Sequence, residues 1–500
     1  MKQEIKQHRC TEEVRGDTSW KRIRMNAFHS LGSFSALMLV LLVQLSIMGA
    51  TEAFVATKIQ LNSRKKSSLD RQFCLEAHFD GSEPEKISLS ADVSRRSALM
   101  SAAKSASAAL LALSIDPSKS FAAEQTITPI AASWKSVDGL NTMEEDQKNF
   151  VGFDGKSYQA MISDSTRTPK FYKAIEERIV DGQTTVLDLG TGPFAIFAIR
   201  AAELGAKKVY AIEANKEAAK VAQETIDKKG YGDVITVLEG FSTDIELPEK
   251  VDLVVAEIIG SVVSEEGVVA TIADAHQRFV KNPTSPKSWI PTRVQTYASP
   301  ASYTLHNMFG PPGFDWSKLN GEPVRFSCRD LGLQLLSDPQ IVEDVVFADI
   351  LNYKKNSVKN KVLKFTVDEA RTKDNTEELV KELQRNQLGK SEATRMAIAT
   401  GKSFTGLAFW PRLILSENET GDKSITIATR EFPNGGHQRS HWQTVLPIMK
   451  DSPVPVQGGD IIEVTANFDV PSGGSKTDIM TPASYQLVGT VTSSMETTSA

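Results

Sequence analysis

The sequence predicts an α/β domain followed by a β-barrel domain, both behind a long N-terminal leader. Three observations support this prediction. Residues 133–289 alternate short apolar strands with charged helical stretches, residues 290–500 contain strand-like runs broken by Gly and Pro, and residues 1–123 have the features of targeting segments. We therefore expect two folded domains in this chain of 500 residues, at 130–289 and 290–500.

The leader begins with an apolar run at 33–47 that follows Lys21 and precedes small residues such as Gly49. This order is typical of a secretory signal peptide, here over residues 1–53. Because a slightly longer stretch would suffice to span a bilayer, an uncleaved signal anchor is the alternative. Only in that case would the protein be membrane-bound.

The segment 54–123 begins with Phe54 and a Ser-, Lys- and Arg-containing stretch, and it resembles the second part of the presequences of algae with secondary plastids. Within it, the Arg95-Arg96 pair precedes an Ala-rich stretch that resembles a twin-arginine signal of the thylakoid type. An Ala-rich linker helix is the alternative interpretation. We expect a plastid location, extended to the thylakoid by the second signal, with the endomembrane system as the alternative.

The charge of the chain is unevenly distributed. Residues 1–123 contain 17 Lys and Arg against 12 Asp and Glu, whereas the remainder contains 40 against 50. An acidic body lacks the electrostatic footprint of nucleic-acid binding and would attract basic peptides. Only Cys328 lies outside the leader, so cysteines form neither an intramolecular disulfide nor a metal site in the body, and we expect no metal.

The first domain opens with a β-α-β pattern. A buried strand and glycine turn occupy 184–192, a helix follows at 193–204, and the next strand, 208–213, ends in Glu213. A helix at 216–229 and two further strands complete the pattern, at 233–239 and 251–257. The carboxyl ends of such strands line one crevice, where open α/β folds bind their ligands.

The glycine turn Gly190-Thr191-Gly192 lets a ligand approach the backbone, and Glu213 can accept both hydroxyls of a ribose. A dinucleotide site would have a third glycine for helix packing, whereas here Ala195 stands in that region. The turn alone leaves a dinucleotide domain, or one without ligand, as an alternative. Asp188, just before the glycines, favours a different nucleotide-type cofactor.

A loop with an acid at each end follows the last of these strands, from Glu257 to Glu266. Two converging carboxylates could share a proton, bind a divalent metal or clamp a planar cation. The residues alone leave these three open, as well as a pair of ordinary surface acids.

Taken together, these stretches resemble the protein arginine N-methyltransferases, a family of class I S-adenosylmethionine-dependent methyltransferases. V-L-D-L-G-T-G is similar to motif I of class I enzymes, and the nine-residue step between Glu257 and Glu266 looks like the family's double-glutamate loop. The resemblance implies a Rossmann-like domain followed by a β-barrel, S-adenosyl-L-methionine as cofactor, and Arg-containing proteins or peptides as substrates. It implies cofactor contacts from Asp188, Gly190, Gly192, Glu213 and Thr243.

Guanidinium chemistry explains the paired acids. A guanidinium has five donors in a rigid fork and stays protonated in water. Methylation therefore needs its charge localised on one nitrogen while a lone pair on another is aimed at the sulfonium methyl. Glu257 and Glu266 would do both, by positioning and electrostatics.

Two more motifs are similar to those of the family. Met161-Ile-Ser-Asp164-Ser-Thr-Arg167 resembles the helix before motif I, whose arginine binds the cofactor carboxylate, and Ser440-His441-Trp442 resembles the T-H-W loop. The resemblance implies that Asp164 pairs with His441, which we count with the catalytic residues. Met161, Asp164 and Trp442 would lie at the substrate site. Taken alone, an amphipathic helix and a core His-Trp pair would be ordinary alternatives.

The match has gaps. The family's aromatic first helix is hard to find, Tyr158 stands where a histidine is common, and Thr243 replaces a glutamate near the adenine. The number of methyl groups transferred is left open. A methyltransferase acting on a small molecule or another side chain, and a non-catalytic dimeric scaffold of the same fold, are the alternative functions.

The second domain contains strand-like runs at 403–410, 424–429 and 460–468. The family resemblance implies a β-barrel here and a dimerisation arm at about 302–330, and hence a homodimer. Residues 368–400 read as a charged helical insertion.

Overall fold

The computed structural model describes residues 22–24, 74–76, 125–136, 159, 161–310, 314–328, 330–353, 357–417, 424–430 and 440–494. The chain divides into two compact units, Met1–Lys119 and Ser120–Ala500. In the first unit, strand β1 (Arg22–Arg24) pairs antiparallel with β2 (Cys74–Glu76). Nearly all of the predicted targeting signals lie outside the described residues. No helix within the described ranges is long and apolar enough to cross a membrane.

The second unit contains a parallel sheet built as the sequence predicts. Its described strands lie in the order β6-β5-β4-β7-β8. Their bounds are β4 (Thr185–Leu189), β5 (Lys208–Glu213), β6 (Ile235–Glu239), β7 (Leu253–Ala256) and β8 (Trp289–Ile290). All five residues of β4 are buried, because helices cover both faces of a central parallel strand.

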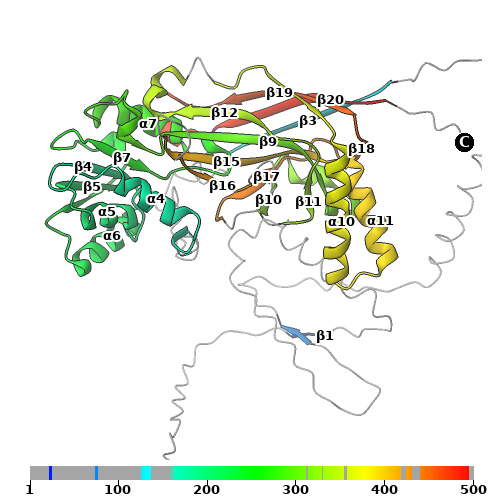
Figure 1. Cartoon of the computed structure of the whole chain (residues 1–500), viewed down its shortest axis with the longest axis horizontal. Coiled ribbons are helices and arrows are strands. Elements are labelled where there is room, and N and C mark those ends of the chain that lie inside the picture. The colour runs from blue at the N-terminus through cyan, green and yellow to red at the C-terminus, as the bar shows by residue number, and fades with distance from the viewer. Residues whose placement is uncertain are drawn as a thin grey trace, which may run out of the picture. The chain divides into compact units, whose positions relative to one another are not determined.

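Of the two helices predicted in this domain, the one at 216–229 has the expected bounds, whereas the one expected at 193–204 runs from Ile196 to Glu203. Helix α6 (Lys216–Lys229) starts where the Asn215 side chain accepts a hydrogen bond from the Ala218 N–H, and it ends at Gly230 in the left-handed region. Figure 1 shows the helices around the sheet. Their bounds are α4 (Arg167–Glu176), α5 (Ile196–Glu203) and α7 (Val268–Arg278), with the 3₁₀ helices η2 (Ser242–Asp244), η3 (Val263–Glu266) and η4 (Pro286–Ser288).

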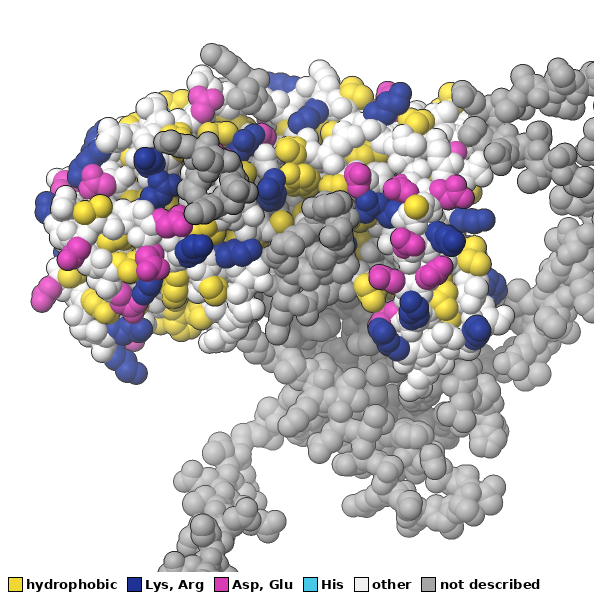
Figure 2. Space-filling model, in the orientation of Figure 1, with side chains coloured by type: hydrophobic (Ala, Val, Ile, Leu, Met, Phe, Trp, Pro, Cys, Tyr) yellow, Lys and Arg dark blue, Asp and Glu magenta, His cyan; other side chains and the backbone are white. Residues whose placement is uncertain are grey.

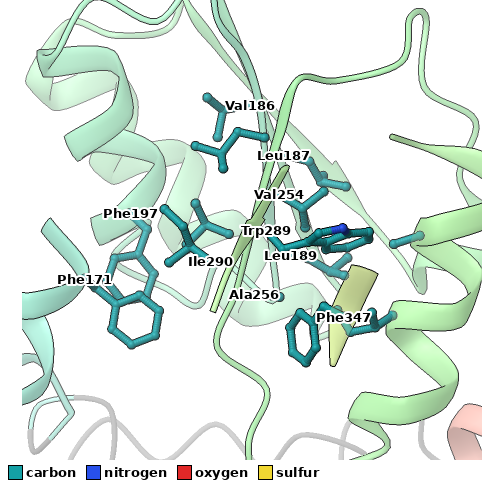
Figure 3. Close-up of a cluster of buried hydrophobic side chains, with 14 of the residues drawn as sticks. Phe171, Val186, Leu187, Leu189, Phe197, Val254, Ala256, Trp289, Ile290 and Phe347 are labelled. Atoms are coloured by element: carbon teal, nitrogen blue, oxygen red, sulfur yellow. The ribbon is translucent and has the colours of Figure 1, made fainter. Parts of the chain in front are cut away.

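The core of the domain lies between the sheet and these helices (Figure 3). Phe171 of α4 stacks on Phe197 of α5, with ring centroids 4.7 Å apart. Trp289 of β8 meets Phe347 of the second domain edge-on, with ring centroids 6.0 Å apart. The apolar core of the α/β domain therefore extends to residues of the second domain such as Phe347.

The second domain is antiparallel. Its larger described sheet has the order β10-β17-β15-β9-β11, with β12 and β16 pairing at its sides, and a second sheet has the order β13-β19-β20-β3. Together they enclose an apolar core, as expected for a barrel. The strands are β3 (Gln125–Lys135), β9 (Arg293–Tyr303), β10 (Val324–Ser327), β11 (Leu333–Leu335), β12 (Gln340–Val346), β13 (Lys361–Thr366), β14 (Ser403–Phe404), β15 (Gly406–Ser416), β16 (Ile425–Ala428), β17 (Gln443–Leu446), β18 (Val454–Pro455), β19 (Ile461–Asp469) and β20 (Ser484–Ser494).

Strand β3 corrects the predicted domain boundary at residue 130. It precedes the α/β domain in sequence, yet it pairs along its whole length with β20, near the C-terminal end (Figure 1). The reason is that Ile130 and Trp134 point into the barrel core, where Trp134 stacks on Tyr485 with ring centroids 4.8 Å apart. The barrel domain is thus formed from both sides of the α/β domain.

Two further segments stand out from the barrel strands. Helices α10 (Glu369–Arg385) and α11 (Lys390–Gly401) occupy the expected helical insertion and form a hairpin (Figure 1). The stretch expected as a dimerisation arm contains α8 (Thr304–Met308) and η5 (Trp316–Leu319). Its described part packs on this chain's own barrel, where Trp316 is buried beside Tyr303.

Candidate active site

The glycine turn lies at the carboxyl end of β4, directly beside the acidic loop. Gly190 and Gly192 have φ values of 77° and 64°, which favour glycine. A Cβ atom at Gly190 would stand 2.7 Å from Cγ2 of Ile258, the residue after Glu257. The turn therefore brings bare backbone to the start of the acidic loop and leaves no room for a side chain there.

Asp188 is buried at the end of β4 and braces this turn. Its Oδ2 accepts hydrogen bonds from the Thr191 hydroxyl at 2.6 Å and from the Ala198 N–H at 3.0 Å. Burial raises the pKa of Asp188 to about 6, against these two hydrogen bonds. Oδ1 is also buried and has no hydrogen-bond partner among the residues that the structure describes. An unpartnered buried acceptor is costly, so this oxygen is suited to receive a donor from a ligand.

Glu213 closes the other side of the turn. Its Oε2 accepts from the Gly192 N–H at 2.9 Å, and its Oε1 accepts from the Asn215 N–H at 2.8 Å. Burial raises the pKa of Glu213 while these N–H groups lower it. Each oxygen has a second acceptor site, so ribose hydroxyls can bind without breaking either bond.

Thr243 lies in η2, next to the strand end that carries Glu213. The Gly240 N–H donates to the Glu213 carbonyl oxygen at 2.9 Å, which holds the two loops side by side. Thr243 is half-buried, and its neighbour Asp244 binds Lys476 Nζ at 2.5 Å. The structure thus places Thr243 in the loop that is tied to the strand end carrying Glu213.

Arg167 and Glu257 form a buried ion pair across this site. Their side chains are only 5% and 6% exposed, and the guanidinium of Arg167 also lies 5.1 Å from the centroid of the Phe197 ring. The resemblance assigned Arg167 to the cofactor and Glu257 to the substrate. In this structure the two residues bind each other.

Glu266 lies at the other end of the acidic loop and is exposed to solvent, whereas the Glu257 side chain is only 6% exposed. Its pKa, that of Glu266, is raised to about 7 by desolvation and by the negative charges of Glu257 and Glu265, and Arg325 opposes this rise. Because the charge of Glu257 acts on Glu266, the two carboxylates predicted from the nine-residue step lie close enough to each other to interact. Their mutual repulsion is relieved by a cation or by a proton.

Asp164 and His441 meet as the resemblance implies. His441 Nδ1 lies 3.3 Å from Asp164 Oδ2, and the His441 N–H donates to the same oxygen at 3.2 Å. Burial acts to raise the pKa of Asp164, but the hydrogen bonds from His441, Arg167 and Thr166 outweigh it and lower this pKa to about 2. Asp164 is therefore a permanent anion at neutral pH.

Trp442 joins the His-Trp segment to the acidic loop. The indole is buried, and its Nε1–H donates to the Ile259 carbonyl oxygen at 2.7 Å. The next residue, Gln443, donates its N–H to the Ser261 hydroxyl at 3.0 Å. Met161 is half-buried, and its carbonyl oxygen accepts a hydrogen bond from the Arg167 guanidinium at 3.4 Å.

Several residues that hold the acidic loop were not predicted from the sequence. They are Glu265 and the barrel residues Thr296, Arg325, Glu343, Tyr353 and Tyr485. For Glu265 a signal existed, because it is an acid next to Glu266. The barrel residues have no local motif, and only the tertiary fold brings them to the loop.

The described residues contain no cluster of potential metal ligands, and the one face of the molecule that Figure 2 draws shows no basic patch. No group of three His, Cys, Asp or Glu side chains among these residues could hold a metal ion. On the face drawn in Figure 2, basic and acidic side chains are interspersed over both domains.

Part of the chain is similar in sequence to known methyltransferases. Residues 168–281 match the sequence profile of ribosomal protein L11 methyltransferase (PrmA). Protein arginine N-methyltransferase PRMT10 of Arabidopsis thaliana is 31% identical over 179 residues, which are 35% of this chain and 45% of that protein. The histone-arginine methyltransferase CARMER of Drosophila persimilis is 36% identical over 151 residues, 30% of this chain and 28% of that protein.

Two solved structures are similar at lower identity. The Arabidopsis thaliana protein arginine methyltransferase 10 has a TM-score of 0.47 and 20% identity, covering 67% of this chain and 96% of that one. The Trypanosoma brucei PRMT1 enzyme-prozyme complex with AdoHcy has a TM-score of 0.45 and 17% identity, covering 62% and 87%.

The chain spans less than half the length of the curated relatives it matches. The segment that matches the PrmA profile, residues 168–281, contains both the glycine turn and the paired acids. The matched portion of the chain is thus similar to protein arginine N-methyltransferases.

Proposed function

We propose that this protein is an S-adenosylmethionine-dependent methyltransferase that N-methylates arginine side chains of proteins. One observation supports this more than any other: the buried carboxylate of Glu257 already binds a guanidinium, that of Arg167, and the charge of Glu257 also acts on the nearby Glu266. A site that accepts an internal guanidinium has the shape and charge to accept one from a substrate.

The residues around the glycine turn fit the cofactor. S-adenosyl-L-methionine supplies a methyl group on a sulfonium. Asp188, with its unpartnered buried oxygen, would receive a donor from the cofactor, Glu213 would bind the ribose, and the turn at Gly190 and Gly192 would present its backbone to the cofactor. Arg167 lies near both Asp188 and Glu257, so it can move to the cofactor carboxylate when a substrate arginine takes its place.

The acids then orient and deprotonate the substrate. Methyl transfer to a guanidinium nitrogen adds a positive charge, so one proton has to leave that nitrogen. The Glu266 carboxylate is suited to accept it, because a pKa of about 7 is close to neutrality. His441, anchored on Asp164, and Trp442, anchored on Ile259, would hold the wall of the pocket.

Radiolabelled methyl transfer tests this function. The full chain should label an Arg-rich peptide and leave the same peptide with Arg replaced by Lys unlabelled. Glu266→Gln should reduce transfer at least a hundredfold, while calorimetry shows unchanged affinity for the demethylated cofactor. Equal labelling by wild type and variant would contradict the carboxylate clamp.

A second candidate function is methylation of another acceptor, a small molecule or a different side chain. The match of residues 168–281 to the PrmA profile favours this alternative, because that profile describes a methyltransferase named for a different substrate. Mass spectrometry of the products after incubation with protein extracts separates the two. A protein that binds neither the cofactor nor its demethylated product would be a non-catalytic scaffold.

For the partners, we infer an Arg-containing basic peptide and a second copy of this chain. The acidic body would attract the peptide. Because the described part of 302–330 packs on this chain's own barrel, a homodimer would use its outer face. Light scattering after gel filtration would measure the dimer directly.

For the location, the leader supports import into a plastid, with the thylakoid as the further destination and the endomembrane system as the alternative. The order of signals in residues 1–123 is the basis for this proposal.

A further inference from the structure

Two adjacent glutamates end the acidic loop, and only one of them can face Glu257. Both lie in the 3₁₀ helix η3, where successive side chains point about 120° apart. The sequence 265–266 does not distinguish them, since both are the same residue type. A contact outside the loop has to select one.

Glu265 is bound on both of its oxygens. Oε1 lies 2.7 Å from Nη2 of Arg325, and Oε2 lies 3.2 Å from Nη1 of the same residue. Oε2 also accepts the Val262 N–H at 3.1 Å. The Glu265 side chain is 7% exposed, so this two-pronged pair fixes its direction.

The loop residues before Glu265 are attached to other barrel strands. The Val263 N–H donates to the Thr296 hydroxyl of β9 at 3.0 Å, and the Ser264 hydroxyl lies 3.0 Å from the Tyr485 hydroxyl of β20. Three successive residues thus bind three different strands. Gly267 then turns the chain into α7 with φ 72°.

We propose that Arg325 is a positioning residue for the methyl-transfer site: by holding Glu265 against β10, it makes Glu266 the carboxylate that faces Glu257. This inference rests on the proposed function and extends it, because a residue of the barrel domain then decides how the α/β domain binds the substrate guanidinium.

The charges around Glu266 give the proposal a second consequence. The charged groups that act on Glu266 are Glu257, Glu265 and Arg325. Arg325 lowers the pKa of Glu266 and Glu265 raises it. Removing Arg325 should therefore shift the pH dependence of the site upward, and removing the charge of Glu265 should shift it downward.

Four variants of the full chain test the inference: Arg325→Met, Arg325→Lys, Glu265→Gln and the double variant Glu265→Gln/Arg325→Met. We expect Arg325→Met to lower kcat/KM for an Arg-rich peptide at least tenfold, with affinity for the demethylated cofactor within twofold of wild type. Arg325→Lys should restore part of this loss. The kcat/KM of the double variant should exceed that of Arg325→Met, because the double variant leaves no unpaired buried carboxylate at position 265.

Arg293→Met is the matched control, because it breaks a partly exposed ion pair with Asp344 elsewhere in the barrel. It should retain wild-type kcat/KM. The pH profiles of Arg325→Met and Glu265→Gln should move in opposite directions, which a merely structural role would not produce. Unchanged kcat/KM and pH profile in Arg325→Met would overturn the inference.

Hydrogen–deuterium exchange gives a result that does not need transfer activity. Arg325→Met should raise exchange in residues 262–267 at least tenfold, and Arg293→Met should not. If wild type transfers no methyl group to arginine, the proposed function fails while the exchange result still decides whether Arg325 holds the loop. Unchanged exchange in Arg325→Met would count against its positioning role.

Discussion

Glu266 combines a functional advantage with a cost in stability. Its pKa rises from the ordinary 4.5 to about 7, chiefly through desolvation. In the folded protein the ionised form is therefore disfavoured, and stability from this group is present below pH 4.5 and is lost as the pH rises through about 7. A cationic substrate would recover that loss by binding the ionised form.

We predict that Glu266→Gln stabilises the protein at pH 8. The gain should be less than about 1 kcal/mol, because Glu266 is exposed and solvent screens its charge. Urea unfolding at pH 8 and pH 4.5 measures it, and the difference from wild type should vanish at the lower pH. An unfolding free energy of Glu266→Gln at pH 8 equal to or lower than that of wild type would contradict the raised pKa of Glu266.

Asp164 behaves in the opposite way. Its pKa is lowered from 3.8 to about 2, since its hydrogen bonds outweigh its burial. The stability it contributes is present above pH 3.8 and is lost as the pH falls toward 2. We expect Asp164→Asn to lower the unfolding free energy by about 2 kcal/mol at pH 7 and by much less at pH 2.5.

The exposed Asp338, which pairs with Arg371, provides the control. Asp338→Asn should change the unfolding free energy by less than about 0.5 kcal/mol at both pH values, because exposed ion pairs contribute little. If the two variants lose the same amount at both pH values, the bonds from His441 do not stabilise the Asp164 anion.

At the scale of elements, the His-Trp segment and the acidic loop act as one unit through Trp442. We predict that Trp442→Phe, which keeps a buried ring but removes the donor to Ile259, raises KM for an Arg-rich peptide severalfold. The unfolding free energy should fall by about 1–2 kcal/mol, because a buried carbonyl oxygen loses its partner.

Trp289 offers a matched control for this prediction. Its Nε1–H donates to the Pro283 carbonyl oxygen at 2.8 Å, and its ring, on strand β8, is fully buried. Trp289→Phe should cost similar stability without changing KM. An equal rise of KM in both variants would show that Trp442 acts through general stability.

Local motifs explain how much of this site could be predicted from sequence. The strand, the glycine turn and α5 follow one another along the chain, so alternation and glycine spacing revealed them. The pairing of Asp164 with His441 followed only from the family resemblance, because 277 residues separate them. The pairing of Glu265 with Arg325 could not be predicted, since no pattern in β10 marks one arginine for a loop 60 residues away.

At the scale of the whole molecule, the barrel is closed by a strand from the opposite end of the chain. The sequence predicts that residue 130 belongs to the α/β domain, because β3 directly precedes that domain along the chain. The pairing of β3 with β20, across more than 340 residues, has no local signal in the sequence. Any cleavage that removes the leader therefore has to occur before Gln125 if the barrel is to keep strand β3.

We therefore predict a sharp limit for N-terminal truncation. A chain that starts at residue 124 keeps all of β3 and should unfold like the full chain. A chain that starts at residue 137 loses the pairing with β20 and the stacking of Trp134 on Tyr485, exposes the edge of β20, and should be several kcal/mol less stable or aggregate. Thermal unfolding and light scattering measure both.

In cells, residues 1–123 fused to a fluorescent protein should direct that protein to the plastid. N-terminal sequencing should show that the mature protein begins at or before residue 125. Cytosolic fluorescence, or a mature N-terminus beyond residue 136, would contradict the link between leader and fold.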